Sequence, residues 1–415
     1  MKRLTAFFTA LVLVLSLFSG CDAKVKAQDL TDGIQPDPVA VTDRFTDGQP
    51  QAVADFAAKL LRQSAQNGES VVISPLSVLY ALAMTANGAD GETLAQMESV
   101  FGLDIDTLNS YLYSTVSTLP SDVGYDIDIA NSIWITDDEG RFVVNDSFVK
   151  TVKSYYDAGV FQQTFNDATL KDINNWVTQK TNGRIQDILD KIDEDAVMYL
   201  VNALNFEADW QNEYVKQDVW EGVFNSPDGA QNVDFMHENL HGYIENDDAT
   251  GFVKYYKGRE YAFVAMLPKQ DIDSFVANLD GEKLTDLLEN IDHSTQVITA
   301  LPKFETTFGT EMSESFKNLG MTDAFDWQTA DFSKMGNARQ EGENVVISRI
   351  IHKAFIRVAE KGTQAGAATV VEMVTEGAMI DPPQPKEVIL DRPFAYMIID
   401  CKNNLPVFIG TVNQI

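Results

Sequence analysis

The most informative stretch of this chain is Glu360-Lys361-Gly362-Thr363-Gln364-Ala365-Gly366-Ala367-Ala368-Thr369-Val370-Val371-Glu372-Met373. From Gly362 to Thr369 it holds only glycine, alanine, threonine and glutamine, so no bulky or charged side chain would obstruct its entry between two strands. Valines 370 and 371 then favour a strand. Alternate residues of a strand share a face. One uncharged face suits burial within a sheet: Thr363, Ala365, Ala367, Thr369, Val371 and Met373. A flexible linker is the alternative.

The segment resembles the hinge and reactive-centre loop of the serpins, in which protease cleavage lets the loop insert as an extra strand into a central sheet. The similarity runs from about Phe56 to the C-terminus. It rests on separate motifs in the family's order: Val71–Val78, Ile173–Val177, Thr181–Ile185, Tyr199–Phe206, Leu301–Glu305, Ile351–Ala354, Asp391–Phe394 and Leu405–Gly410. The resemblance implies a mixed α+β fold with helices around three β-sheets and a mobile loop over about residues 360–386.

Composition is compatible with this fold without predicting it. The chain has 415 residues and 45% hydrophobic content, enough for one large domain or two to three average ones. A net charge of −31 and a pI near 4.3 argue against nucleic acid or an anionic membrane surface as a partner, because both would repel the protein. Any membrane attachment is therefore expected only through a lipid anchor.

The N-terminus predicts export. Lys2 and Arg3 precede an apolar run over residues 4–18, which suits a signal-peptide core. Ser19-Gly20-Cys21 resembles a bacterial lipobox, in which Cys21 would be lipidated. We therefore expect a lipoprotein-type signal peptide at residues 1–20, a flexible tether at 21–46 and a single domain at 47–415. The protein would be anchored to the bacterial cell envelope or surface; an ordinary signal peptide and secretion are the alternative.

If Cys21 carries lipid, Cys401 is the only remaining cysteine and no intramolecular disulfide can form. Cys401 follows an apolar run and is expected at a strand end. The periodicity predicts helices over residues 53–66, 75–87, 92–101, 146–156 and 170–188. It predicts strands over residues 126–135, 197–206, 251–257, 261–267, 296–303, 347–360, 387–390, 396–400 and 407–412. These elements indicate one mixed domain.

One motif points to another function. His237-Glu238-Asn239-Leu240-His241 matches HExxH, in which two histidines one helical turn apart bind zinc and the glutamate activates water. That chemistry needs a helix, whereas this stretch follows the strand-like residues 232–236 and precedes Gly242. A zinc metalloprotease is thus a minor alternative, and we expect no metal or other cofactor.

The sequence contains no GxSxG, GxxxxGK[ST] or paired CxxC motif, so we do not expect an enzyme. His352 could act as a catalytic base, but the favoured interpretation is a buried structural histidine. In the family, the matching histidine belongs to a polar cluster beneath the opening sheet, whose partners carry over to Ser74, Ser77 and Asn202. Such a network would hold the sheet closed until the loop enters.

The resemblance also assigns roles at the base of the loop. Lys303 and Glu360 match a family ion pair, with two independently solvated charges as the alternative. Trp210 matches the tryptophan at the point where the sheet opens. The expected hinge comprises Glu360, Gly362, Thr363, Ala365, Gly366, Ala367 and Ala368.

The mechanism implied by the resemblance uses stored conformational energy. A target serine protease attacks the loop and forms an acyl-enzyme in a covalent 1:1 complex with a monomeric inhibitor. Loop insertion then carries the protease away before hydrolysis is complete. The family spacing from Glu360 places the scissile bond at Glu376-Gly377, but the loop is longer than usual. The bait is therefore expected within Val374, Thr375, Glu376, Gly377 and Ala378.

Small and β-branched residues dominate this bait, which slightly favours an elastase-like or subtilisin-like target over a glutamate-specific one. Two alternatives remain within the family. The protein could also, or instead, inhibit papain-like cysteine proteases by the same trap. It could also be a noninhibitory serpin acting as a binding protein, although the small hinge residues disfavour this.

Overall fold

The computed structural model describes residues 25–42, 45, 48–65, 68–119, 125–137, 142–193, 196–338, 344–363 and 384–415, and the structural statements below concern these residues. The element most relevant to function is a seven-stranded sheet. Its order is β1 (Gln28–Asp29), β5 (Gly159–Gln162), β3 (Tyr125–Ile135), β6 (Met198–Asp209), β15 (Gly362–Thr363), β14 (Arg349–Ala359) and β12 (Phe304–Glu311). The central strand β6 is buried along nearly its whole length, with Asn202 and Asn205 as buried polar residues among its apolar ones.

A nine-stranded sheet forms the other half of the molecule. Its main path is β16 (Lys386–Ile389), β11 (Asp292–Pro302), β8 (Gly229–Glu245), β9 (Ala249–Tyr255), β10 (Tyr261–Pro268), β17 (Phe394–Asp400), β18 (Leu405–Val412) and β2 (Val71–Ile73). Strand β7 (Val219–Ser226) pairs with β8 off this path. A two-stranded sheet joins β4 (Phe142–Val144) and β13 (Gly336–Ala338). The expected three β-sheets and mixed α+β fold are therefore confirmed.

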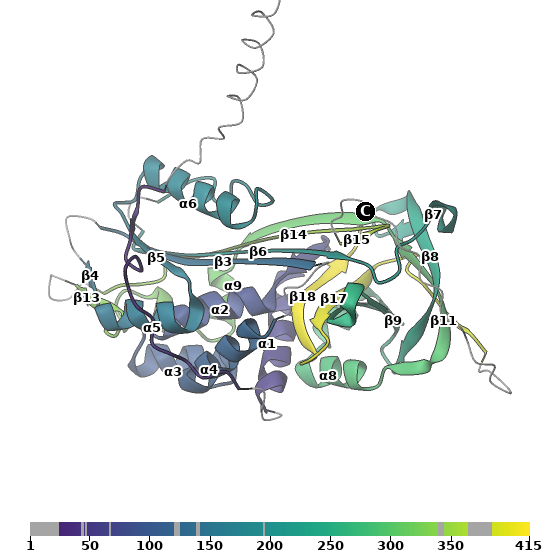
Figure 1. Ribbon diagram of the computed structural model, residues 1–415, viewed down its shortest axis with the longest axis horizontal. Helices are drawn as coiled ribbons and strands as arrows, with labels where there is room; N and C mark the ends of the chain where they lie inside the picture. The colour runs from purple at the N-terminus through teal and green to yellow at the C-terminus, as the bar shows by residue number, and fades with distance from the viewer. Residues whose placement is uncertain are drawn as a thin grey trace, which may run out of the picture.

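Helices cover both faces of the seven-stranded sheet (Figure 1). Helix α6 (Asp167–Lys180) lies on one face, where Trp176 packs with Trp134 and Phe161. The helices drawn beneath the other face include α1 (Gly48–Ser64), α2 (Pro75–Ala86), α3 (Gly91–Phe101), α4 (Ile105–Ser117), α5 (Asp146–Tyr156) and α9 (Ser313–Asn318). Helices α7 (Ile272–Ala277) and α8 (Gly281–Glu289) precede β11.

Helix α2 is the buried helix beneath the sheet. Ser74 caps it, since the Ser74 side chain accepts a hydrogen bond from the Ser77 N–H, and Pro75 occupies its first turn. Every residue of α2 is buried, which agrees with its apolar sequence. The helix thereby brings Ser74 and Ser77 to the underside of β6 and β14.

The segment before α1 differs from the expected tether. Strand β1 pairs with β5, and the N–H groups of Lys26 and Ala27 donate to the buried Asp172 carboxylate at 2.9 and 3.1 Å. Farther along, the Asp37 N–H donates to Ser154. Residues 25–42 therefore form an arm along the domain rather than a free tether. Their polar composition conceals this, because several of the contacts that hold the arm are made by its backbone N–H groups.

Most expected elements are present, with different ends. The helix expected over residues 170–188 ends at Lys180, because Asn182 and Gly183 adopt left-handed backbone angles, with φ of 50° and 79°. The elements that were not expected include helices α4, α7, α8 and α9 and strands β5, β7 and β12. Cys401 lies at the end of β17, as predicted. Among the described residues, no helix is long and apolar enough to cross a membrane.

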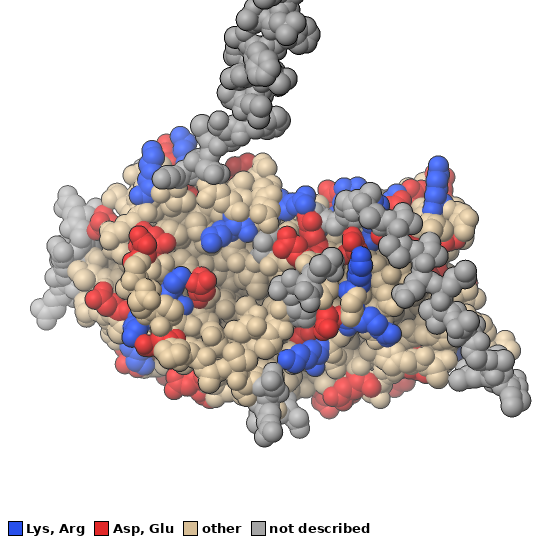
Figure 2. Space-filling model, viewed as in Figure 1, with Lys and Arg blue, Asp and Glu red and all other residues tan. Residues whose placement is uncertain are grey.

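Acidic side chains are spread over the molecular face shown in Figure 2, with basic side chains between them. Several acidic side chains of the described residues form ion pairs, such as Asp37 with Lys150 and Asp157 with Lys153. The visible charge is thus distributed over this face.

Candidate functional site

Strands β6 and β14 are neighbours at one end and separate at the other. They pair in parallel from Tyr199 with Arg349 to Leu204 with Ala354. Beyond that point β15 lies between them (Figure 1). Gly362 is opposite Asp209 and Ala359 in its two neighbours. The first residues of the proposed hinge therefore already form a strand inside the seven-stranded sheet.

The side chains of this short strand explain its position. A Cβ atom on Gly362 would lie only 1.9 Å from the carbonyl oxygen of Ala208, so the close approach to β6 requires glycine. Thr363 is 1% exposed, and its hydroxyl hydrogen-bonds the Tyr256 hydroxyl at 2.7 Å. Thr363 thus points into the protein, as expected for the uncharged face of the segment.

The residues after β6 bind the chain that leads into β15. Trp210 donates through its indole Nε1 to the Ala359 carbonyl at 2.9 Å and through its backbone N–H to the Lys361 carbonyl at 2.7 Å. The Tyr214 N–H donates to the Glu360 carbonyl at 2.8 Å. Trp210 also stacks on Tyr256, with ring centroids 4.4 Å apart. Trp210 therefore lies where the sheet opens, in direct contact with the hinge.

The expected ion pair at the base of the loop is present. Lys303 Nζ lies 2.9 Å from Glu360 Oε1 and 3.1 Å from Asp234 Oδ2. The hydrogen bond with Glu360 raises the pKa of Lys303. Partial burial is the largest single influence and acts to raise the pKa of Glu360, but the hydrogen bonds and the positive charge of Lys303 together outweigh it, so this pKa is lowered. Because these side chains are about one-third exposed, water screens the attraction.

A buried polar cluster lies deeper under the same two strands. The Ser74 N–H donates to His352 Nε2 at 3.3 Å, and His352 Nδ1 bonds Asn202 Oδ1. Asn202 also donates to Ser77. His352 is wholly buried, and burial lowers its pKa to about 3, so the ring is neutral at physiological pH. Nε2 then accepts and Nδ1 donates. With no route to solution, His352 is not placed to act as a catalytic base.

Asn131 of β3 completes this cluster and was not anticipated from the sequence. Its side-chain oxygen accepts hydrogen bonds from both Ser77 and Asn202. The cluster therefore joins α2, β3, β6 and β14. The signal available in the sequence was an isolated polar residue among inward-facing apolar positions of a predicted strand.

The chain matches the family described as Serpin (serine protease inhibitor) over residues 51–415. The chain belongs to the serpin family. An uncharacterized serpin-like protein of Thermococcus kodakarensis is 30% identical over 387 residues, covering 90% of this chain and 88% of the relative.

The serpin fold of this chain is also found in the solved structures of tengpin, a thermophilic serpin. Tengpin in its native state is 43% identical, with a TM-score of 0.88 and coverage of 94% of this chain and 100% of tengpin. For the latent state of tengpin the identity is 42%, the TM-score 0.78, and the coverage 90% and 99%. The described residues thus resemble the native arrangement more than the latent one.

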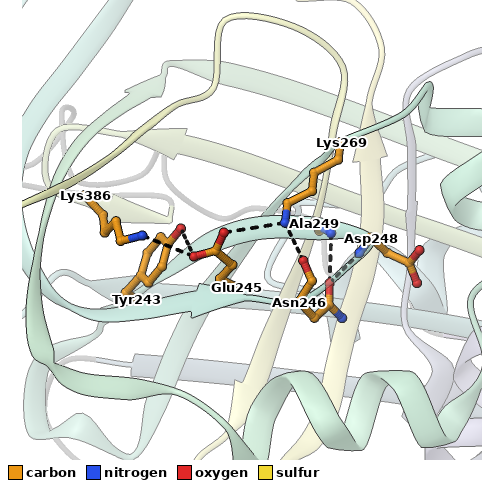
Figure 3. A network of polar contacts seen from close by, with 7 residues as sticks. All are labelled: Tyr243, Glu245, Asn246, Asp248, Ala249, Lys269 and Lys386. Carbon is orange, nitrogen blue, oxygen red and sulfur yellow. Dashed lines mark hydrogen bonds and ion pairs between the residues drawn. The ribbon is translucent and has the colours of Figure 1, made fainter.

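The far end of the serpin loop is fixed at β16, which pairs in parallel with β11. Lys386, the first residue of β16, binds Glu245 Oε2 at 3.3 Å, and its ammonium lies over the Tyr243 ring (Figure 3). Glu245 also accepts a hydrogen bond from Tyr243 and pairs with Lys269. The Tyr243 hydrogen bond, followed by that from Lys386, lowers the pKa of Glu245. A partly exposed charged network therefore lies beside β16, where the loop rejoins the nine-stranded sheet.

The zinc hypothesis does not fit the local structure of this serpin. His237 to His241 lies within strand β8, where residues four apart are separated by about 13 Å, too far for both imidazoles to bind one zinc ion. His237 stacks on Trp220, and Glu238 pairs with Lys254. Alternation in the strand also turns Glu238 to the face opposite that of His237. The helix that the HExxH motif needs is replaced by a strand.

Several predicted site residues lie outside the described residues. They are the bait positions Val374, Thr375, Glu376, Gly377 and Ala378, the hinge positions Ala365, Gly366, Ala367 and Ala368, and the lipidation position Cys21. The structure brings together the remaining hinge residues with Trp210 and Lys303 at the opening of the sheet. It brings His352, Asn202, Ser74 and Ser77 together in the polar cluster.

Proposed function

We propose that this serpin irreversibly inhibits serine endopeptidases, of the elastase-like or subtilisin-like class, by trapping the acyl-enzyme through loop insertion. The position of strand β15 is the main support for this proposal. Two residues of the loop already pair with both β6 and β14, so insertion has only to extend a strand that exists. The costly first contacts of strand formation are thereby made before any protease arrives.

The register of β15 supports a specific path for the loop. Thr363 is opposite Ala208 of β6 and Val358 of β14. Continuing this antiparallel register would bring Ala367 opposite Leu204 and Ala354, which are both fully buried. It would bring Thr369 opposite Asn202 and His352. The inserting strand would therefore replace the direct Asn202–His352 contact of the polar cluster with a threonine hydroxyl.

The chemistry of the trap belongs to the target protease. Its serine attacks a carbonyl carbon in the bait, the peptide bond breaks, and the C-terminal fragment leaves with a proton on its new amine. The protease remains joined to the serpin as an ester. Insertion of about 15 residues then moves this ester roughly 50 Å from the docking site and distorts the protease before water can attack.

The bait composition supports a protease with a small apolar pocket, and the same trap would act on papain-like cysteine proteases through a thioester. The proposed setting is outside the cytoplasm, either on a bacterial cell envelope through a lipid on Cys21 or after secretion. The basis for this setting is the sequence of residues 1–21.

The substitution Ala367→Arg tests the proposal. An arginine at this position would have to enter the apolar space between Leu204 and Ala354, and burying an unpaired charge there is strongly unfavourable. We expect the variant to be cleaved as an ordinary substrate. Gln364→Arg is the matched control, because the same register places residue 364 on the opposite face, between the partly exposed Glu207 and the exposed Arg357. Stable adducts formed equally by both variants would contradict the register.

A further inference from the structure

Lys254 is a buried cation beside the opening of the seven-stranded sheet. It lies on β9 and its side chain is only 2% exposed. Its ammonium pairs with Glu238 of β8 and donates to the Asn212 carbonyl at 3.0 Å. The ammonium also lies over two aromatic rings, 4.1 Å from the Tyr214 ring centroid and 5.2 Å from that of Trp210. Four groups thus surround a single charge.

These contacts offset the unfavourable free energy of burying an ammonium group. An isolated buried charge would be lost to deprotonation or would destabilise the fold, so it needs an opposite charge and hydrogen-bond acceptors. Burial lowers the pKa of Lys254, and the attraction to Glu238 opposes that shift. The faces of Tyr214 and Trp210 add cation–π attraction. The ammonium is therefore bound to the segment 210–214 on several sides.

The same segment holds the hinge. Trp210 contributes its indole and backbone N–H groups, and Tyr214 its backbone N–H, to the carbonyls of residues 359–361. Gln211 also ties the segment to β9, because its N–H donates to the Tyr255 carbonyl at 3.0 Å. Lys254 touches the side chains of both hinge-binding residues without touching the hinge itself. Trp210 and Tyr214 therefore connect Lys254 to the hinge.

We propose that Lys254 and Glu238 form a positioning pair, which fixes segment 210–214 as the anchor from which the cleaved loop extends into the sheet. A firm anchor keeps Gly362 and Thr363 in register with β6 and β14 while the rest of the loop enters. A loose anchor delays insertion and gives water time to release the protease. The pair thereby sets the division of attacked serpin between trapped adduct and cleaved product. This last consequence rests on the proposed inhibitory function, whereas the anchoring itself does not.

The test compares Lys254→Met with Lys317→Met in the full chain. Lys317 is a matched control because it also combines a carboxylate, Glu314, with an aromatic ring, Phe325, but lies partly exposed on α9. Hydrogen–deuterium exchange is followed by mass spectrometry in fragments covering residues 208–216. We expect exchange of the Trp210 and Tyr214 amides to become at least about tenfold faster in Lys254→Met, because breaking a buried pair is strongly destabilising. Lys317→Met should leave it unchanged.

Two further measurements separate anchoring from general stability. The double variant Lys254→Met/Glu238→Gln removes both charges, so we expect slower exchange in this segment than in Lys254→Met alone. With a protease that forms an adduct, Lys254→Met should raise the ratio of cleaved serpin to adduct while leaving the rate of loop cleavage unchanged.

Unchanged exchange in fragment 208–216, or faster exchange spread evenly over all fragments, would overturn the anchoring role. If exchange changed as expected but the wild-type protein formed no adduct with any protease, the proposed inhibitory function would fail and the anchoring role would stand. Faster local exchange with an unchanged ratio of cleaved serpin to adduct would overturn the link between the anchor and trapping.

Discussion

Gly362→Ala should dislodge the hinge from the sheet. The added Cβ would lie 1.9 Å from the Ala208 carbonyl oxygen, 2.8 Å from Asp209 Cα and 2.9 Å from the Ala208 carbonyl carbon. All three atoms belong to the backbone of β6, which cannot move aside like a flexible side chain. Either β6 shifts locally or β15 leaves its place between β6 and β14.

The expected cost follows from these two responses. Overpacking in a closely packed interior costs about 1–3 kcal/mol. Expelling β15 instead would sacrifice the pairing of two residues with each neighbouring strand, together with the buried Thr363–Tyr256 hydrogen bond. A hydrogen bond contributes about 1 kcal/mol net, so this route has a similar cost. We therefore expect destabilisation of about 1–3 kcal/mol, with expulsion of the hinge as the visible consequence.

Gly309→Ala is the matched control, since Gly309 lies on β12 of the same sheet and an added Cβ would meet only the Lys353 side chain, at 3.5 Å. Urea unfolding gives the stability change, and hydrogen exchange of the Thr363 amide reports the position of the hinge. We expect a lower urea midpoint and faster Thr363 exchange in Gly362→Ala alone. If Gly362→Ala behaved like Gly309→Ala in both measurements, the steric argument for the hinge would be refuted.

Two further predictions concern the polar cluster and the arm. Burial lowers the pKa of His352 to about 3, whereas an unfolded histidine has a pKa of about 6.5, so the unfolded chain binds the extra proton and stability falls as the pH drops below about 6.5. Between pH 7 and pH 5, His352 should lower the free energy of unfolding by about 2 kcal/mol. The urea midpoint should therefore depend less on pH in His352→Gln than in the wild-type protein. Parallel pH curves for the two proteins would contradict this role of His352. Asp172→Ala removes the acceptor of two arm N–H groups and should cost about 1–3 kcal/mol, with faster exchange at Lys26 and Ala27, whereas unchanged exchange there would show that the arm is held by other contacts.

The sequence predicts that Gly362 and Thr363 suit a strand inside the sheet, because the requirements at these two positions are local. A run of small residues leaves space for close strand contacts, and Gly362 shows this directly through its approach to Ala208. Alternation in a strand also predicts the inward direction of Thr363, which contacts Tyr256.

The unexpected contacts all depend on tertiary neighbours far apart in sequence. Lys254 lies in an ordinary strand pattern, and only the fold brings Glu238, Trp210 and Tyr214 around its ammonium. The arm over residues 25–42 has a composition typical of a tether, yet Asp172 and the free edge of β5 supply partners for its backbone. The HExxH pattern wrongly suggests a zinc site, because its spacing brings the two histidines together only on a helix, whereas β8 is a strand.

The trap itself is tested most directly by incubating the purified protein with neutrophil elastase, subtilisin, trypsin, a glutamyl endopeptidase and papain. Each mixture is examined by denaturing gel and intact mass. We expect a denaturant-resistant 1:1 adduct with at least one serine protease, accompanied by a released C-terminal peptide whose mass locates the scissile bond within residues 374–378. If every enzyme that attacks the loop cleaves it without forming an adduct, the proposed trap would be contradicted and a noninhibitory serpin would be indicated.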